Sequence, residues 1–281
     1  MGRGVNGDEW WYARLYPGAA SGMDTVAAGA SRWAKRTAGE IDARCWYFIR
    51  YVDATGVHIR LRVRAAPDAL DTLDGRCGPL RELVAATGGS RSPAHRRLIP
   101  EAGTLDTPGP PGVRLGAYEP EVDKYGRGHL RDAEAAFQDS SELMLDLDAT
   151  GKPQPGARAG LAAHLMREAA TAVLTEAECR EFWPFHRGYW GEHLRLLRLS
   201  KTTLQKRLDT VVATIAGHPP TEAELDLLRG WSDRLARRLH TSEPSRRPRL
   251  FFHHLHMSMN RLGYLPAEEA MIGLAMIGGG K

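Results

Sequence analysis

Two β-rich runs joined by a short turn constrain the fold of this chain more than any other feature. Residues 45–52 (CWYFIRYV) and 57–63 (VHIRLRV) are dominated by aromatic and β-branched side chains, which favour strands. Residues 53–56 (DATG) have the composition of a tight turn, so the runs are predicted to form an antiparallel hairpin. Alternation along the second run separates an apolar face, Val57, Ile59, Leu61 and Val63, from a polar face, His58, Arg60, Arg62 and Arg64. Such a line of cations is costly unless it meets solvent or an anion.

The first half of the chain contains further strand and helix signals. An aromatic-rich run precedes the breaker Pro17-Gly18, and Asp24 is in position to cap the helix that follows. A long stretch rich in Gly, Pro and Ser is predicted to be a loop. The expected elements around the hairpin are a strand at 9–16, a helix at 25–37, a helix at 67–86 weakened by Gly75 and Gly78, a loop at 88–112 and a strand at 113–119.

The second half of the chain has apolar residues at three- and four-residue spacing, which is typical of helices. Thr221 and Glu224 form a capping-box pattern at the start of one of them. The expected helices cover 130–147, 157–174, 176–182, 189–216, 221–240 and 266–277, with a breaker at 151–156. Early strands and late helices predict an α+β fold, in which an antiparallel sheet, mainly from the N-terminal half, packs with helices, mainly from the C-terminal half. We expect residues 1–281 to form a single domain.

Bulk composition excludes several classes of protein. Hydrophobic residues make up 42% and charged residues 26% of the 281, as in ordinary soluble proteins. The N-terminus lacks an apolar signal region, and no apolar run approaches the roughly 18 residues of a membrane span, so we expect a cytoplasmic protein without a membrane partner. Cys45, Cys77 and Cys179 are far apart and form no CxxC pair, which argues against a disulfide framework or a zinc site.

The net charge of +4 is only a mild excess of cations. Runs of arginine are usually solvated faces. A positive groove for an acidic peptide is the sharper alternative, and nucleic acid is a third.

Three segments concentrate polar side chains that packing alone would not require. Residues 58–62 (HIRLR) form either a solvent-facing strand side or a face that binds an anion. Residues 118–126 (YEPEVDKYG) form either a polar loop or a group of side chains for hydrogen bonding and proton transfer. Residues 251–264 (FFHHLHMSMNRLGY) hold three histidines without the spacing of a known metal site. We therefore expect core histidines or a metal-free active site there.

Taken together and in this order, the motifs at 46–51 (WYFIRY), 58–62, 118–126 and 256–262 resemble the C-terminal domain of lantibiotic dehydratases. That domain also occurs as a standalone thiopeptide-type bacteriocin biosynthesis protein. The resemblance implies one of two activities. One is elimination of glutamate from glutamylated serine or threonine, and the other is pyridine synthesis by formal aza-[4+2] cycloaddition of two dehydroalanines.

Two departures from the elimination pattern favour the pyridine synthase. Elimination domains usually carry arginine where this chain has Lys124, and lysine cannot reproduce the bidentate grip of arginine on a carboxylate. They also tend to have a second histidine where this chain has Ser258, whereas Ser258 and Tyr264 match pyridine synthases. The alternative is a glutamate-eliminating dehydratase subunit, which the arginines of HIRLR keep open.

The resemblance also implies roles for individual residues. The expected catalytic residues are Tyr264, Ser258, His254, Glu121 and Tyr118, and the expected substrate-binding residues are Arg60, Arg62, Lys124, Tyr125, His256, Asn260 and Arg261. The reaction is redox-neutral, so neither a cofactor nor a metal is expected. The expected partner is a precursor peptide with an acidic leader and a dehydroalanine-containing core, bound by a monomer or weak homodimer, with no nucleic acid. One shared pocket is expected to hold all three motifs.

Overall fold

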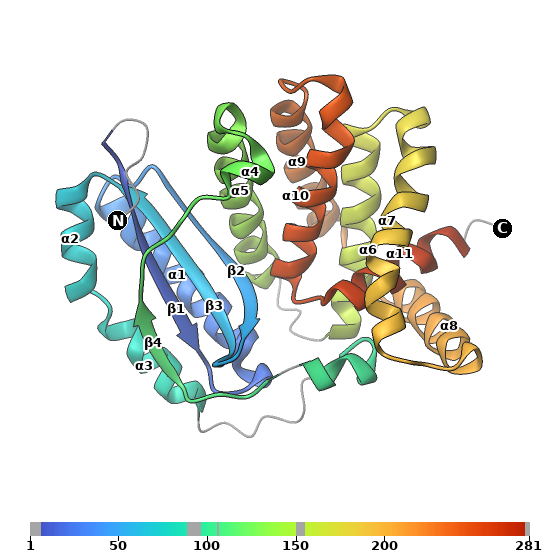
Figure 1. Ribbon diagram of the computed structural model, residues 1–281, viewed down its shortest axis with the longest axis horizontal. Coiled ribbons are helices and arrows are strands. Elements are labelled where there is room, and N and C mark those ends of the chain that lie inside the picture. Colours follow the sequence, from blue (N-terminus) through green and yellow to red (C-terminus); the bar gives the residue numbers. More distant parts are fainter. Residues whose placement is uncertain (1–6, 89–96, 106, 150–154, 279–281) are drawn as a thin grey trace. The chain divides into compact units, whose positions relative to one another are not determined.

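The computed structural model describes residues 7–88, 97–105, 107–149 and 155–278, and the chain divides into two compact units (Figure 1). The first unit comprises residues 1–95 and 104–145, and the second comprises 96–103 and 146–281. Strands occur in the first unit, and the described part of the second unit is helical. The predicted α+β class is therefore confirmed, with the sheet formed by the N-terminal half.

The sheet of the first unit has the order β2-β3-β1-β4, and every neighbouring pair is antiparallel. Its strands are β1 (Glu9–Tyr16), β2 (Cys45–Asp53), β3 (Gly56–Ala65) and β4 (Gly112–Leu115). Helix α1 (Met23–Glu40) connects β1 to β2, and α2 (Pro67–Gly75) with α3 (Gly78–Gly88) follows β3. This is the split βαβ arrangement of a βαββαβ unit.

Apolar alternation fixes which face of the sheet is covered. Ile59 and Leu61 of β3 are fully buried, as are Val26 and Ala30 of α1, so α1 packs against this face. Figure 1 shows α1 lying along the sheet. The same alternation turns the arginines of β3 to the opposite face.

The outer edge of β2 is covered by side chains of α5 (Leu130–Ala149). The backbone amide of Trp46 donates to the side-chain oxygen of Gln138 (3.2 Å), and that of Phe48 donates to the hydroxyl of Ser141 (3.3 Å). An edge strand otherwise presents a row of unpaired amides. Helix α4 (Val122–Tyr125) and a 3₁₀ turn, η3 (Arg127–His129), lead into α5.

The second unit is a bundle built around α6. Its helices are α6 (Pro155–Val173), α7 (Glu176–Leu196), α8 (Lys201–Gly217), α9 (Glu222–Leu239), α10 (Arg247–Leu262) and α11 (Pro266–Gly278), with a short η4 (Pro244–Arg246). Helix α6 contacts α8, α9, α10 and α11, and α11 also contacts α7 and α8. The core includes Met166, Trp231, Phe251 and Ile272.

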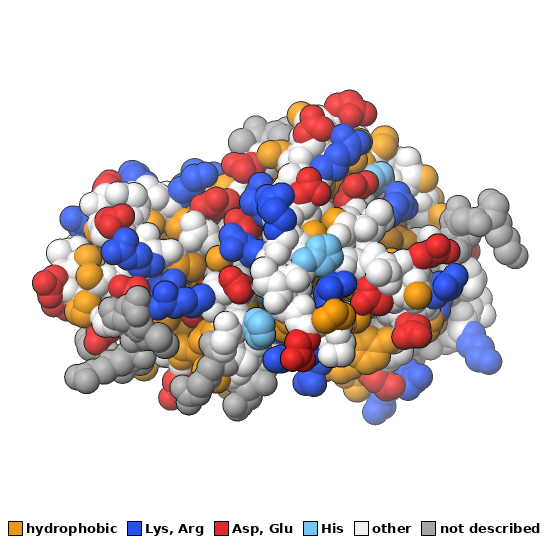
Figure 2. Space-filling view, turned by 90° about the horizontal axis from the view of Figure 1, so that it is seen from above, with side chains coloured by type: hydrophobic (Ala, Val, Ile, Leu, Met, Phe, Trp, Pro, Cys, Tyr) orange, Lys and Arg blue, Asp and Glu red, His pale blue; other side chains and the backbone are white. Residues whose placement is uncertain are grey.

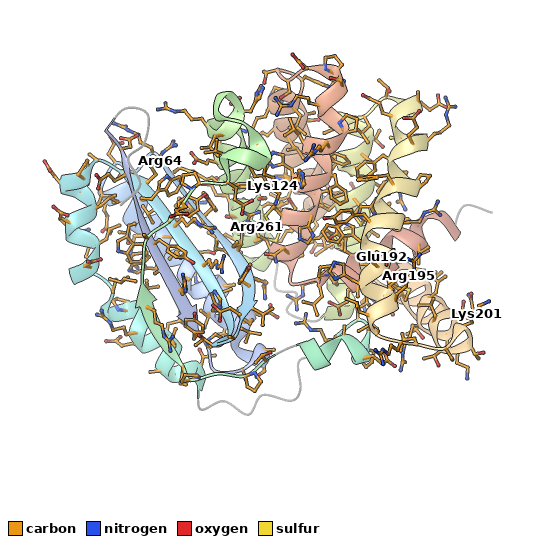
Figure 3. All side chains as sticks on the ribbon, in the orientation of Figure 1. Arg64, Lys124, Glu192, Arg195, Lys201 and Arg261 are labelled. Atoms are coloured by element: carbon orange, nitrogen blue, oxygen red, sulfur yellow. The ribbon has the colours of Figure 1, made fainter. Side chains whose placement is uncertain are left out.

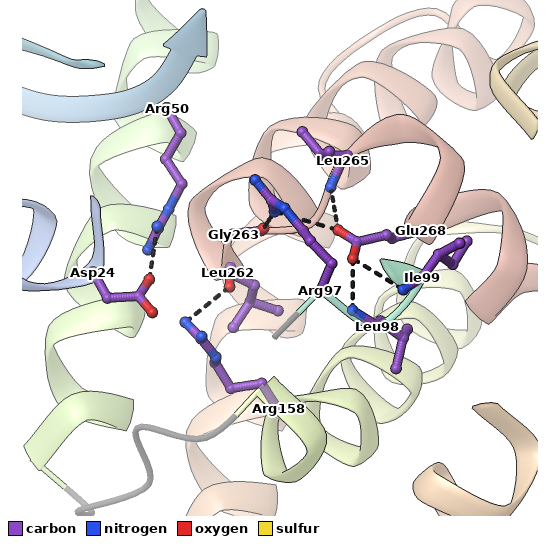
Figure 4. A network of polar contacts seen from close by, with 10 residues as sticks. All are labelled: Asp24, Arg50, Arg97, Leu98, Ile99, Arg158, Leu262, Gly263, Leu265 and Glu268. Atoms are coloured by element: carbon purple, nitrogen blue, oxygen red, sulfur yellow. Dashed lines mark hydrogen bonds and ion pairs between the residues drawn. The ribbon is translucent and has the colours of Figure 1, made fainter. Parts of the chain in front are cut away.

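A buried carboxylate ties a connecting segment to this bundle (Figure 4). Glu268 at the start of α11 accepts hydrogen bonds from the backbone amides of Leu98 (2.7 Å), Ile99 (3.4 Å) and Leu265 (3.0 Å). The Arg97 guanidinium lies 3.5 Å from the same carboxylate. The short η2 (Pro100–Leu105) follows directly. Part of the expected loop at 88–112 is therefore anchored, while 89–96 and 106 lie outside the described residues.

Four details of the predicted elements are wrong. Asp24 does not cap α1, because it lies inside the first turn and pairs with Arg50 at 2.7 Å (Figure 4). The expected helix at 67–86 is broken into α2 and α3 near Gly75 and Gly78. Helix α7 continues through Pro184, and the expected break at 183–188 instead follows Leu196. Strand β4 is also shorter than expected.

Other expectations about the elements are confirmed. The hairpin, the strand at 9–16 and the final helix form as predicted, and Thr221 with Glu224 completes a capping box. The breaker residues 151–154 lie outside the described residues. No helix within the described ranges has the length and apolar character needed to cross a membrane.

Candidate functional site

Arg62 lies in a cluster of tyrosines on the polar face of the sheet. The register of β3 places it directly opposite Tyr12 of β1 and Tyr47 of β2. Its guanidinium carbon lies 4.4 Å from the ring centre of Tyr118, 5.2 Å from that of Tyr47 and 5.4 Å from that of Tyr12. The residue is only 5% exposed, and within the described residues its Nε has no hydrogen-bond acceptor. Aromatic faces attract this cation but cannot replace a counter-ion.

Tyr118 and Tyr47 form a hydrogen-bonded pair beside Arg62. Their hydroxyl oxygens are 2.8 Å apart, and both residues are buried. Burial raises the pKa of Tyr47 and also that of Tyr118, although the charge of Arg62 opposes both shifts. Both phenols therefore stay neutral near pH 7 and can donate a hydrogen bond.

Arg60 is oriented by two neutral groups. Its guanidinium carbon lies 3.3 Å from the ring centre of Tyr51, and its Nε donates to Nε2 of His58 (3.2 Å). Nδ1 of His58 lies 3.1 Å from the carbonyl oxygen of Gly56, so it carries the proton of the neutral ring and donates there. Burial lowers the pKa of His58, which keeps this ring neutral.

A buried acid faces the next arginine along β3. Arg64, labelled in Figure 3, forms a close ion pair with Glu134 of α5, which is 2% exposed. Burial raises the pKa of Glu134 to about 7, and the charge of Arg64 only partly opposes this. The thiol of Cys45 donates to the Glu134 backbone carbonyl (3.5 Å). This acid therefore changes charge near neutral pH.

The loop motif at 118–126 divides between two environments. Tyr118 joins Arg62, as described above. Glu121 and Lys124 pair with each other at 3.2 Å near the surface, where Figure 3 labels Lys124. Tyr125 is 1% exposed and packs against Phe137 of α5, with ring centres 5.3 Å apart. The expected binding role of Tyr125 stays a prediction, and its burial shows that its ring is part of the core.

The late motif forms helix α10, which resolves the choice between strand and helix for its histidines. His254, Ser258 and Arg261 are buried on one side of this helix. The hydroxyl of Ser258 donates to the backbone carbonyl of His254 (2.9 Å), and Nη1 of Arg261 donates to that of Met257 (3.0 Å).

Two further expected site residues, Asn260 and Tyr264, lie in the last turn of α10 and just after it. Asn260 is partly buried in the last turn. Gly263 has φ of +95°, a left-handed conformation that ends the helix, and Tyr264 follows it with 5% exposure. Tyr264 therefore leaves the helix axis and lies in the buried part of the second unit.

His256 lies on the other side of α10, about 200° around the helix from His254 and Ser258. Its Nδ1 is 2.7 Å from Glu269 of α11, and the same carboxylate lies 3.0 Å from Nε2 of His186 on α7. We call these three residues the histidine–glutamate cluster. The Trp190 ring stacks on His256 with ring centres 4.2 Å apart.

Glu269 is fully buried, and burial alone would raise its pKa. His256 and His186 together outweigh that effect and lower the pKa of Glu269 to about 2. The ionised carboxylate fixes the ring of His256, because Nδ1 must donate to it. With its side chain 19% exposed, His256 keeps Nε2 for a proton transfer or a hydrogen bond.

Sequence reasoning missed Glu269 and His186 in this cluster, Trp190 beside it, and Tyr12 and Tyr47 around Arg62. One signal was present for Glu269, because Glu268 and Glu269 are adjacent acids at the start of an otherwise apolar helix. No group of three or more His, Cys, Asp or Glu within the described ranges is arranged to hold a metal ion. That the two groups of residues act on one peptide stays a prediction.

Comparison with known proteins gives a consistent set of similarities. The sequence profile of a family described as lantibiotic biosynthesis dehydratase C-term matches residues 10–276. The pyridine synthase TbtD from thiomuracin biosynthesis superposes with a TM-score of 0.63 at 18% identity, covering 95% of this chain and 96% of TbtD. TsrL superposes with a TM-score of 0.59 at 14% identity, covering 95% of this chain and 94% of TsrL.

A larger relative is similar over only part of its length. The tRNA-dependent lantibiotic dehydratase MibB from Microbispora sp. 107891 superposes with a TM-score of 0.54 at 22% identity. The match covers 98% of this chain but 28% of MibB. No curated protein sequence matches the chain.

Proposed function

The chain belongs to the lantibiotic biosynthesis dehydratase C-terminal family, and from this premise we propose that it is a pyridine synthase of thiopeptide biosynthesis. The observation that carries the proposal is the match to TbtD, which spans nearly all of both chains. The match to the dehydratase MibB covers only 28% of that protein. The second support is Lys124, whose charge is already compensated by Glu121 and which replaces the arginine expected of an elimination domain.

The proposed reaction joins two dehydroalanines of one modified precursor peptide. One dehydroalanine tautomerises at its amide to an azadiene, and the alkene of the other adds across it in a formal aza-[4+2] cycloaddition. Loss of water and expulsion of the leader peptide as an amide then give the aromatic pyridine and close the macrocycle. Holding two alkenes in contact supplies up to roughly 7–11 kcal/mol of the barrier reduction.

Proton transfers after ring formation need groups that stay neutral until they act. We assign Tyr264 and Ser258 to hydrogen bonds with the reacting amide, with His254 assisting from the same part of the chain. Tyr118 and Glu121 orient the substrate or return a proton. Tyr118 is suited to this role because burial raises its pKa and keeps it a donor near pH 7. These transfers require no cofactor and no metal.

Binding of the precursor is assigned to charged and amide side chains. Arg60 and Arg62 carry charges that no carboxylate compensates within the described residues, so they are suited to an acidic leader. Lys124, His256, Asn260 and Arg261 complete the proposed binding set. Affinity should fall as salt rises toward physiological strength, where the Debye length is about 8 Å.

Mass spectrometry of a dehydroalanine-bearing precursor tests the proposed reaction. The purified protein, with chelator present and no added cofactor, should yield a cyclised core and a leader that ends in a carboxamide. A parallel incubation with a glutamylated precursor tests the rival activity. Release of glutamate there, with an unchanged dehydroalanine precursor, would overturn the proposal.

A further inference from the structure

Three arginines stand side by side across the polar face of the sheet. Arg14 of β1 lies directly opposite Arg60 of β3 on one side and directly opposite Arg114 of β4 on the other. We call these three residues the arginine row. Adjacent strands are about 4.8 Å apart, so the row spans about 10 Å of the sheet.

No acid compensates the row. Within the described ranges, Arg14, Arg60 and Arg114 have no carboxylate at ion-pair distance. Other arginines of the same sheet do have one, since Arg50 pairs with Asp24 and Arg64 pairs with Glu134. Like charges directly opposite each other destabilise a sheet. A sheet that retains three of them therefore carries a cost that a bound anion would remove.

Neutral groups hold each guanidinium of the row in place. Nε of Arg14 donates to the hydroxyl of Tyr12 (3.0 Å), and this hydrogen bond is the main reason that the pKa of Arg14 is raised. Arg60 stacks on Tyr51, and the guanidinium carbon of Arg114 lies 5.0 Å from the ring centre of Tyr16. The row is thus oriented without being neutralised.

The row is accessible, and it adjoins a buried cation. Arg114 is exposed, and Arg14 and Arg60 are half-buried. Arg62, two residues along β3 from Arg60, is 5% exposed, and its Nε has no acceptor within the described residues. An anion on the row would therefore meet three reachable cations and lie near a fourth that is buried.

We propose that the arginine row binds an acidic stretch of a peptide through two or more of its carboxylates. In an extended peptide, side chains two residues apart are about 7 Å apart, which fits within the span of the row. Guanidinium groups bind carboxylates through paired N–H donors, so each arginine can take one carboxylate. If the proposed function holds, this segment is the acidic leader of the precursor.

The aromatic rings around the row disfavour single-stranded nucleic acid as the ligand. Such ligands stack their bases on open aromatic faces. Here Tyr12 and Tyr16 are 4% and 1% exposed, and the face of Tyr51 is covered by Arg60. Among the described rings around the row, Tyr51 is the one with open surface, at 44% exposed, and Arg60 occupies one of its faces.

Fluorescence anisotropy with the full-length protein at low salt tests the proposal. One labelled synthetic peptide alternates glutamate with serine, a second has glutamine in place of each glutamate, and a third probe is labelled oligo-dT. Arg114→Gln and Arg14→Gln should each weaken binding of the glutamate peptide by about tenfold. The matched control is Arg32→Gln, which removes the same charge from an exposed position on α1 and should change affinity less than twofold.

Three results would overturn the proposal: equal effects of the row variants and of Arg32→Gln, equal binding of both peptides, or tighter binding of oligo-dT. Because Arg114 is exposed, its substitution tests the row without disturbing packing. The same proteins are assayed for cyclisation of the dehydroalanine precursor. Row-dependent binding without cyclisation refutes the proposed function alone, and cyclisation without row-dependent binding refutes this inference alone.

Discussion

The polar face of the sheet and the histidine–glutamate cluster differ in how their charged side chains are compensated. On the sheet, Arg62 is buried among tyrosines, and the arginine row has no carboxylate at ion-pair distance within the described residues. In the helical unit, the ionised Glu269 contacts two imidazoles and is itself fully buried. The first region is left with unneutralised charge and the second region is internally paired.

The same contrast is seen in the pKa values of two buried carboxylates, Glu134 beside the sheet and Glu269 in the cluster. Glu134 faces one arginine, and burial raises its pKa to about 7. Glu269 faces two histidines, which outweigh burial and lower its pKa to about 2. The comparison teaches that burial alone does not decide the charge of an acid, because hydrogen bonds and neighbouring side chains can outweigh it. The Glu134 carboxylate beside the sheet therefore changes charge near neutral pH, whereas the Glu269 carboxylate stays ionised there.

Figure 2 shows that basic and acidic side chains are interspersed over the surface it presents. The surface is thus not uniformly basic, in keeping with a net charge of only +4. The proposed binding of an acidic peptide would then depend on local clusters such as the arginine row, which lies on one sheet face. Four experiments, in order of decreasing effect, test the contrast between the two regions.

The largest effect is expected from Glu269→Gln. This change removes the buried carboxylate charge that both His186 and His256 contact, and removing one partner of a buried charged contact costs about 3–5 kcal/mol of the free energy of unfolding. Urea denaturation followed by circular dichroism measures it. Glu192→Gln removes an acid from an exposed pair with Arg195, both labelled in Figure 3, and should cost less than about 0.5 kcal/mol. Equal losses in the two variants would contradict an internally paired cluster.

Opposite pH dependences should follow from the two buried acids. The pKa of Glu269 is lowered to about 2, so its stabilisation is complete above about pH 4.5 and is lost as pH falls toward 2. The pKa of Glu134 is raised to about 7, so its contribution is complete below about pH 4.5 and is lost as pH rises toward 7. For each acid, the difference between its pKa in the folded protein and the usual value of 4.5 changes the free energy of unfolding by about 3 kcal/mol.

Urea denaturation across this pH range, with Glu134→Gln as the comparison, separates the two acids. The free energy of unfolding of the wild type should decline between about pH 4.5 and 7 relative to that of Glu134→Gln. Parallel curves for the two proteins would show that Glu134 is ionised throughout, and the contrast between the regions would then be lost.

Replacing Tyr264 with Phe should separate turnover from binding. Loss of a proton-transferring hydroxyl is expected to lower the turnover number for cyclisation by about a hundredfold. Affinity for the acidic peptide should stay unchanged, because binding of its carboxylates is assigned to the arginine row. Single-turnover kinetics and anisotropy measure the two effects. Tyr189→Phe changes an exposed tyrosine of α7 and is the matched control. Full turnover in Tyr264→Phe would remove this residue from the catalytic set.

The smallest effect is expected from Tyr51→Leu. The ring is 44% exposed and lies 3.3 Å from the guanidinium carbon of Arg60. A cation–π contact at an exposed site is worth about 0.5–1 kcal/mol, so affinity for the glutamate peptide should fall about two- to fivefold. Tyr189→Leu, an exposed change on another helix, should leave that affinity unaltered. An unchanged affinity in Tyr51→Leu would show that Arg60 needs no ring to hold it.

Local rules predicted the hairpin and its two faces, because alternation is a property of neighbouring residues. They also predicted the basic face at Arg60 and Arg62. The arginine row was not predictable, since Arg14 and Arg114 join it only through the register of β1 with β3 and β4. The partner of His256 was hidden for the same reason, because Glu269 lies on another helix.

Two details of the helices were not predictable from local residue preferences. A break between 182 and 189 was expected, yet α7 continues through Pro184, because packing of this helix against α11 overrides the local preference. Asp24 has the residue type of a cap but pairs with Arg50. The expected single pocket and single domain depend on long-range arrangement, and both stay predictions.

The edge of β2 limits the ways in which a peptide could bind to the sheet. Gln138 and Ser141 already accept hydrogen bonds from the amides of Trp46 and Phe48, so a substrate gains no backbone template by adding as an extra strand at those positions. The proposed recognition by guanidinium groups would instead depend on the positions of the carboxylates. Under the proposed leader binding, the residues between those carboxylates could be rewritten in the leader without loss of this recognition.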